Sequence, residues 1–133
     1  AAAPPAAQAL PLALQDVQIA CGPGQPAIHL TWLAWGWVDT PHTLYLHLLD
    51  ANGAKIAQVD AALDPPPAAW PLRTPVPITQ TLDPPAIPPA SLRLGLYAWA
   101  DAFQTIIPAH FFAPDRTLTA QIDLPWPDCA PAP

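Results

Sequence analysis

Few residues of this chain have the chemistry for catalysis or ligand binding, and His47 stands out among them. It lies between leucines in LYLHLLDANGAKIAQVD, residues 44 to 60. If this segment is a strand with its leucines inward, His47 points to the same outer side as Tyr45. Two interpretations follow. The imidazole either hydrogen-bonds a neighbouring strand, with Asp60 as the candidate partner, or it lines a ligand-binding face with Tyr45 and Asp60.

Catalytic residue types are present without a catalytic arrangement. All ten acidic residues are aspartates, and the spacing of Asp50, Asp60, Asp64 and Asp101 selects no pair for general acid–base work. Aspartate is also common in turns for backbone reasons alone. The only serine, Ser91, lacks a nucleophile-elbow setting, and the five glycines are too scattered for a phosphate-binding loop. We therefore predict that the protein is not an enzyme.

The cysteines and histidines are not spaced as metal ligands. A metal site needs three or four ligands, and none cluster with His47, so we predict neither a metal nor a cofactor. Cys21 and Cys129 are expected to form a disulfide, because closing a loop of roughly 100 residues stabilises by about 4–5 kcal/mol. That bond implies an oxidising compartment, the periplasm or the cell surface. Two unpaired thiols, one of them buried, are the alternative.

The charge of the chain excludes several classes of partner. The net charge is −6, and only four lysines and arginines are present to neutralise phosphates, which argues against nucleic acid and anionic lipid. The longest apolar stretch, residues 27–38, is interrupted by His29, Thr31 and Gly36. We therefore expect no direct membrane span. A signal peptide is not expected either, since the positively charged leader segment is missing.

Proline and side-chain alternation determine the expected fold class. The chain has 22 prolines among 133 residues, with clusters at 65–67, 84–85 and 88–89 that mark loops or sheet edges. Between the clusters, apolar and polar residues alternate with a period of two, which is typical of half-buried strands. Asp50-Ala51-Asn52-Gly53 supplies a hairpin turn. We expect strands near residues 12–20, 27–35, 44–49, 54–63, 76–82, 91–100, 103–107 and 116–124.

These segments predict an all-β domain: an immunoglobulin-like or jelly-roll β-sandwich of seven or eight short antiparallel strands with long proline-rich loops. Residues 1–11 read as a Pro/Ala-rich linker, 12–126 as the sandwich and 127–133 as a tail. The residues expected to face the core are Leu14, Ile19, Ile28, Leu30, Trp32, Leu44, Leu46, Leu48, Leu92, Leu94, Leu96, Ala98, Leu118, Ala120, Ile122 and Leu124.

Aromatic residues suggest where the sandwich makes contact with other molecules. Six tryptophans are present; Trp32 is expected in the core, whereas Trp99 lies on the outer side with Tyr97. The candidate surface for a partner or a sugar is Tyr45, His47, Arg93, Tyr97 and Trp99. Exposed rings on a sheet stack on sugars or anchor proteins. The alternative is that proline-rich loops cover these rings and form a second small core.

Two segments carry a resemblance to a known family. The matching residues are Trp32, then His47-Leu48-Leu49-Asp50 with Gly53, Gln58 and Asp60, then Trp70-Pro71, then Gly95-Leu96-Tyr97. Over residues 28–108 the chain resembles the β-sandwich domain on the C-terminal side of multi-pass membrane glycosyltransferase-like proteins of filamentous phototrophic bacteria. Ala98 departs from that pattern, since the family has an aspartate there. The resemblance implies an accessory domain outside the membrane and does not imply sugar transfer.

The sequence therefore predicts a non-catalytic extracytoplasmic β-sandwich. We expect it to dock onto or stabilise a larger membrane or envelope protein assembly, with a protein as its partner. Few charges and abundant alanine and proline suit permanent packing against such a partner. The alternatives are a carbohydrate-binding module and an accessory domain of a membrane glycosyltransferase.

Overall fold

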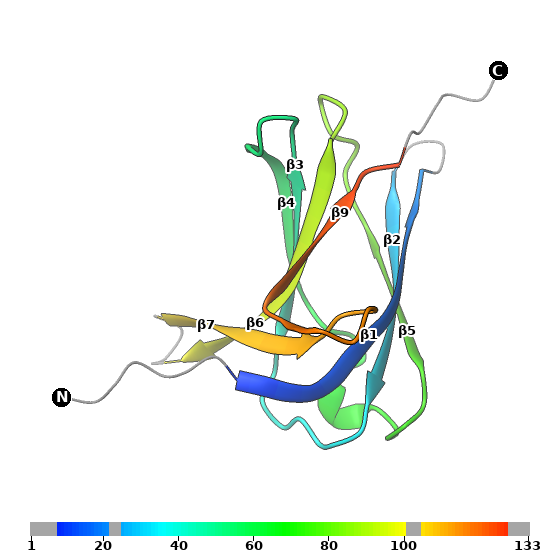
Figure 1. Ribbon diagram of the computed structural model, residues 1–133, viewed down its shortest axis with the longest axis vertical. Helices are drawn as coiled ribbons and strands as arrows, with labels where there is room; N and C mark the ends of the chain where they lie inside the picture. Colours follow the sequence, from blue (N-terminus) through cyan, green and yellow to red (C-terminus); the bar gives the residue numbers. More distant parts are fainter. Residues whose placement is uncertain (1–7, 22–24, 101–104, 128–133) are drawn as a thin grey trace.

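The computed structural model describes residues 8–21, 25–100 and 105–127, and this part of the chain is almost entirely β. Its strands are β1 (Gln8–Ala20), β2 (Ala27–Ala34), β3 (Thr43–Leu49), β4 (Lys55–Ala62), β5 (Val76–Thr81), β6 (Ser91–Ala100), β7 (Thr105–Phe112), β8 (Leu118–Thr119) and β9 (Gln121–Pro125) (Figure 1). One short 3-10 helix, η1 (Pro67–Ala69), interrupts the loop before β5. The predicted all-β class is confirmed.

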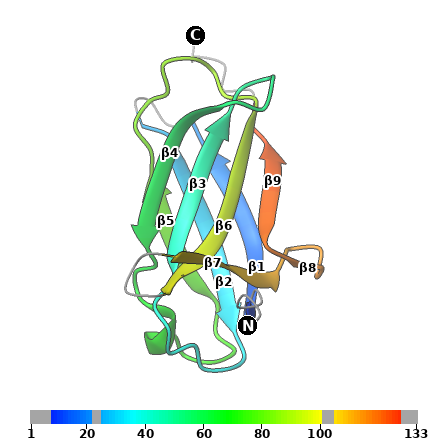
Figure 2. The ribbon, with the colours of Figure 1, turned by 90° about the vertical axis from the view of Figure 1, so that its left-hand side faces the viewer.

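The strands form two layers that are joined into one curled sheet. The strand order is β4-β3-β6-β7-β1-β2-β5, with β8 paired to β7 and β9 paired to β6. One layer holds β4, β3 and β6, and the layer behind it holds β1, β2 and β5 (Figure 2). β7 joins the layers because it pairs antiparallel with β6 and parallel with β1. The fold is thus sandwich-like, with the curl of a half-barrel.

The strand order favours the immunoglobulin-like alternative over the jelly roll. The first, second and fifth strands share one layer, and the third and sixth share the other, as in immunoglobulin domains. The fourth strand pairs with the third instead of joining the first layer. Two details differ from the prediction: nine strands are described instead of seven or eight, and the β1–β7 pair is parallel.

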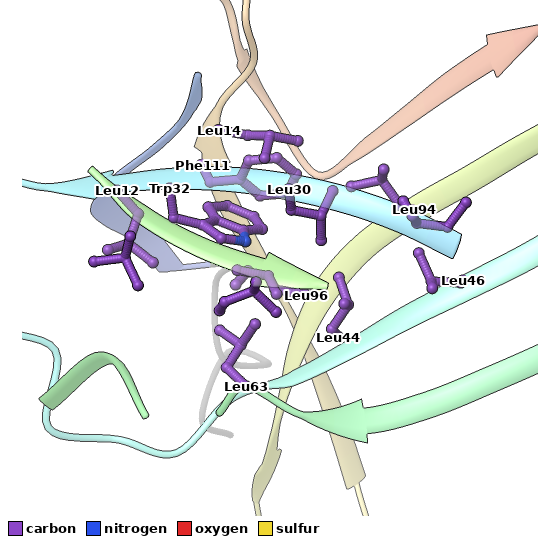
Figure 3. Packing of buried hydrophobic residues seen from close by; sticks show 14 of the residues in the cluster. Leu12, Leu14, Leu30, Trp32, Leu44, Leu46, Leu63, Leu94, Leu96 and Phe111 are labelled. Atoms are coloured by element: carbon purple, nitrogen blue, oxygen red, sulfur yellow. The ribbon is translucent and has the colours of Figure 1, made fainter. Parts of the chain in front are cut away.

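Alternating side chains build the core as predicted. On β3 and β6 the inward leucines Leu44, Leu46, Leu94 and Leu96 are at most 2% exposed. They meet side chains from β1 and β2, such as Leu14, across the space between the layers (Figure 3). A slip of one residue in the register would turn a whole row of leucines to solvent. These rows therefore fix the pairing of the strands.

Three aromatic rings fill one end of this core. Trp32 on β2 is fully buried, and its ring centroid lies 5.4 Å from that of Phe111 and 6.2 Å from that of Trp70. Trp70 follows η1 and donates its indole N–H to the carbonyl oxygen of Pro65 at 2.7 Å. The proline-rich loop therefore seals the sandwich with a buried ring instead of lying loosely over it.

The segment expected to close the sheet, residues 116–124, is divided, and the inward placement predicted for Leu118 is wrong. After β7 the chain turns back through Asp115, whose carboxylate accepts hydrogen bonds from the backbone and hydroxyl of Thr117. Leu118 then pairs with β7 and is 48% exposed. Only from Gln121 does the chain rejoin β6, as β9. The expected alternation is interrupted because two short strands replace one long strand.

The ends of the domain differ slightly from the predicted boundaries. β1 begins at Gln8, so residues 8–11, predicted to be part of the linker, belong to a strand with Leu10 buried. At the other end Trp126 packs against the core. Cys21 directly follows β1, but Cys129 lies outside the described residues, so the disulfide stays a prediction. Among the described residues, no helix is long and apolar enough to cross a membrane.

Candidate functional site

The outer side of the β4-β3-β6 layer gathers the predicted surface residues. We call it the aromatic face and define it as Tyr45, His47, Gln58, Asp60, Arg93, Tyr97 and Trp99. Strand register arranges these residues in rows that run across the sheet. One row is Gln58, His47, Arg93 and Asp123, the next is Asp60, Tyr45, Gly95 and Gln121, and the third is Ala62, Thr43, Tyr97 and Pro108.

Gly95 allows the ring of Tyr45 to lie close against the sheet. The two residues are direct cross-strand partners. A Cβ atom at position 95 would come within 2.7 Å of three atoms of the Tyr45 ring and hydroxyl. The missing side chain thus creates the space that the ring occupies, an arrangement in which an aromatic residue covers a strand glycine. The Tyr45 ring also lies 5.0 Å from the His47 ring and 6.2 Å from that of Tyr97.

Asp60 is held by its neighbours instead of by His47. The hydroxyl of Tyr97 donates to Asp60 Oδ2 at 2.7 Å, and Gln58 Nε2 donates to Oδ1 at 2.8 Å. The register places His47 opposite Gln58, and Asp60 opposite Tyr45. Burial raises the pKa of Tyr97, and the hydrogen bond to Asp60 raises it further. The phenol therefore stays protonated at neutral pH and keeps donating to the carboxylate.

Arg93 is fixed by an ion pair on the rim of this face. Its Nε donates to Asp123 Oδ1 at 2.8 Å and its Nη2 donates to Oδ2 at 3.2 Å. The fork geometry orients the guanidinium, although both side chains are partly exposed and the pair adds little stability. Trp99 packs edge-on against Tyr97, with ring centroids 5.6 Å apart. Arg93 and Tyr97 thus each have a neighbour that limits their rotamers.

A groove runs along the aromatic face. Its volume is about 360 Å³, near the lower limit for small-ligand pockets. The lining consists of Tyr45, His47, Gln58, Asp60, Arg93, Tyr97, Ile106, Pro108 and Gln121. Four of the five predicted surface residues therefore line one groove, and the fifth, Trp99, supports Tyr97 beside it.

The outer side of the opposite layer has a different character. The register aligns Gln18, His29 and Thr79 in one row across β1, β2 and β5, with Thr31 in the next row. His29 Nδ1 lies 2.9 Å from the hydroxyl oxygen of Thr79, a contact within hydrogen-bond distance. Small polar residues of this kind are the usual solvent face of a sandwich. Aromatic rings are concentrated instead on the outer side of the β4-β3-β6 layer. A face that only contacts solvent does not need them.

A second surface lies at the end of β2, where we define the apolar end as Trp35, Trp37, Phe112 and Leu118. Trp35 is 43% exposed and Trp37 is 66% exposed. The Trp35 ring lies 5.4 Å from that of Phe112, which pairs across β7 and β8 with Leu118. Sequence reasoning missed this grouping because Trp35 and Leu118 are distant in the chain. Only the β7–β8 hairpin brings them to the same end.

Two histidines have pKa values below the ordinary value. Burial lowers the pKa of His42, partly opposed by the hydrogen bond from its Nδ1 to the carbonyl oxygen of Thr40 at 2.8 Å. Burial also lowers the pKa of His47, and the positive charge of Lys55 adds to the effect. Both imidazoles are therefore neutral at neutral pH. His42 is 3% exposed, and its Nε2 has no hydrogen-bond partner among the described residues.

Acid is expected to destabilise the fold through these histidines. An unfolded histidine ionises near pH 6.5, so between that value and the lower folded pKa the unfolded chain binds more protons. The histidine contribution to the free energy of unfolding is then complete above about pH 7 and falls as the pH drops below about 6.5. Denaturant unfolding at pH 7.5 and pH 5.5 measures this loss. His42→Gln should show a smaller loss than wild type; an equal loss would contradict the assignment.

The described residues contain no group of three or more histidine, cysteine, aspartate or glutamate side chains placed to hold a metal ion. Comparison of the chain with protein-family models, with curated proteins and with solved structures gives no match. Function is therefore inferred from the geometry of the aromatic face and of the apolar end. The sequence did not single out Ile106, Pro108 and Gln121 as groove residues, since only the pairing of β7 and β9 with β6 places them there.

Proposed function

We propose that this chain is a non-catalytic, extracytoplasmic β-sandwich domain that docks onto or stabilises a larger membrane or envelope protein assembly. The apolar end is its docking surface. The observation that supports this most directly is the exposure of Trp35 beside Phe112 and Leu118, with the more exposed Trp37 two residues further along the chain. Contiguous exposed apolar side chains are uncommon on monomeric proteins, and tryptophan and phenylalanine are enriched at the centres of interfaces.

Contacts with Pro11 hold the backbone of this segment at Trp35 and Gly36. Trp35 donates its backbone N–H to the carbonyl oxygen of Pro11 at 3.1 Å. Gly36 lies so close to the Pro11 ring that an added Cβ would come within 2.9 Å of it. A recess of about 370 Å³ opens beside Trp37, lined in part by Pro11 and Val38. An exposed aromatic side chain beside a recess is typical of an energetically dominant contact in a protein interface.

Charges around the apolar end favour a protein over a lipid surface. Arg73 lies next to the end of β2, where its backbone N–H donates to the carbonyl oxygen of Ala34 at 2.7 Å. Asp115 and Arg116 belong to the turn between β7 and β8, and Asp39 closely follows Trp37. An apolar centre with a rim of both charge signs suits a protein partner. A surface for anionic lipid would carry clustered cations without acidic residues among them.

The cellular context of this proposal comes from the sequence. The expected Cys21–Cys129 disulfide supports an oxidising location, and the resemblance described above suggests a membrane glycosyltransferase-like protein as the assembly. An accessory domain severed from its catalytic part would still carry a docking surface. Both points stay predictions. The docking experiment bears on them as well, because it is done in the native cell envelope.

Native gel electrophoresis of the chain in its own cell envelope tests docking. We expect the wild-type chain to migrate in a complex far larger than its own 14.1 kDa. The double variant Trp35→Ser/Trp37→Ser should migrate alone, because it removes the apolar centre of the contact while leaving the buried core intact. His29→Ser, on the polar face of the other layer, is the matched control and should stay in the complex. A double variant that remains fully assembled would contradict the proposal.

A further inference from the structure

We propose that the groove of the aromatic face binds a neutral pyranose sugar, with the Tyr45 ring as the platform under it. This inference goes beyond docking, because it concerns a different surface from the apolar end. It rests on three features: a ring held against the sheet, polar groups held around that ring, and a local charge balance that leaves no net positive charge to attract an acidic sugar.

The platform is built into the strand pairing. Tyr45 lies over Gly95 and lines the groove, so one side of its ring rests on the sheet and the other is turned towards the groove. The Tyr97 ring is nearly parallel to it, with an angle of 26° between the planes. Aromatic side chains offer an apolar face with a polar edge, which matches the apolar C–H face and polar rim of a pyranose. Little conformational entropy is lost on binding because Tyr45 is already seated.

The polar groups around the platform are oriented before a ligand arrives. Asp60 is aligned by Tyr97 and Gln58, and each of its oxygens keeps a further lone pair for a sugar hydroxyl. Gln121, in the same row as Tyr45, offers both an amide N–H and a carbonyl oxygen. A sugar hydroxyl both donates and accepts, so the carboxylate at one end of the row and the amide at the other can bind hydroxyls on two sides of the ring. A small number of polar groups with fixed geometry gives binding specificity at low entropic cost.

The charge balance favours a neutral sugar. Arg93 is already committed to the carboxylate of Asp123, while Asp60 contributes a negative charge on the other side of the groove. The chain as a whole carries a net charge of −6. Lys55, which donates to Gln58 Oε1, and Arg93 together balance Asp60 and Asp123, so the groove has no net positive charge to attract the carboxylate of an acidic sugar. The volume of about 360 Å³ fits one or two sugar rings and not a folded protein segment.

Titration of the full chain with methyl hexopyranosides and short oligosaccharides, followed by NMR of the amide protons, tests this site. We expect shifts confined to the strands around the groove, β3, β4, β6, β7 and β9, and binding that weakens at least tenfold in Tyr45→Ala and in Asp60→Asn. Tyr45→Phe should retain most of the affinity, since it keeps the ring; this variant guards against loss of folding as the explanation. Glucuronic acid should bind more weakly than glucose.

Three results would overturn the sugar assignment. They are absence of binding to any neutral sugar on a glycan array, binding that survives Tyr45→Ala, and shifts on the face that carries His29. Trp35→Ser/Trp37→Ser should bind sugar as wild type does. Failure of the sugar experiment is thereby separated from failure of docking, because each surface has its own variants and its own readout.

Discussion

Replacing Trp32 by alanine is expected to lower the free energy of unfolding by about 3–5 kcal/mol. The side chain is fully buried between the layers and contacts Trp70 and Phe111, so its removal leaves a cavity that rigid strands cannot close. Domains of this size are typically stable by about 5–15 kcal/mol, so the variant would lose a large fraction of the total. Denaturant unfolding monitored by far-UV circular dichroism measures the change.

Trp37→Ala is the matched control for this experiment. It removes the same side chain from a site that is 66% exposed, and we expect a change within about 0.5 kcal/mol. Trp32→Phe should fall between the two, because it keeps an aromatic ring and removes an indole N–H that has no hydrogen-bond partner among the described residues. Equal stability losses in Trp32→Ala and Trp37→Ala would mean that the layers do not close over Trp32 as described.

Replacing Gly95 by alanine is expected to destabilise the fold by about 1–2 kcal/mol and to abolish sugar binding in the groove. The new methyl group would occupy the space of the Tyr45 ring, which must then leave the sheet and expose its packed side. In an ordinary strand the same change is favourable, since alanine loses less backbone entropy than glycine. The sign of the effect therefore reports whether Tyr45 lies over Gly95.

The background variant Tyr45→Ala separates these two contributions. In its presence Gly95→Ala should become neutral or stabilising by about 0.5–1 kcal/mol, because no ring opposes the methyl group. The difference between the two backgrounds is the coupling energy of the pair. If Gly95→Ala stabilised both the wild-type protein and the Tyr45→Ala variant, the described position of the ring would be contradicted.

Period-two alternation was sufficient to predict much of this fold. Leucines at positions 44, 46, 92, 94 and 96 are buried because the strands they occupy pair in the register that turns all of them inward. The Asp50–Gly53 hairpin also followed from local chemistry: the Asp50 carboxylate accepts from the N–H of Asn52 and of Ala54, and Gly53 has a φ of +82°. Both features depend on residues that are close in the chain.

Non-local pairing explains what the sequence could not predict. Leu118 has the spacing of a core residue, but the turn at Asp115 pairs it with β7 and leaves it exposed. The same hairpin brings Leu118 to the apolar end, and no local sequence pattern predicts this grouping. On the aromatic face the outer residues of β3 and β6 were predictable from alternation. The contributions of Ile106 and Gln121 were not, because β7 and β9 share the edge of β6 in a way that only the folded chain reveals.

Photo-crosslinking in the native envelope tests docking through the apolar end most directly. A benzophenone amino acid in place of Trp37 reports what lies against that surface, and the same group in place of His29 reports on the polar layer. Docking predicts a crosslinked protein adduct of one defined mass from position 37 and none from position 29. No adduct at position 37, or the same adduct from both positions, would contradict it.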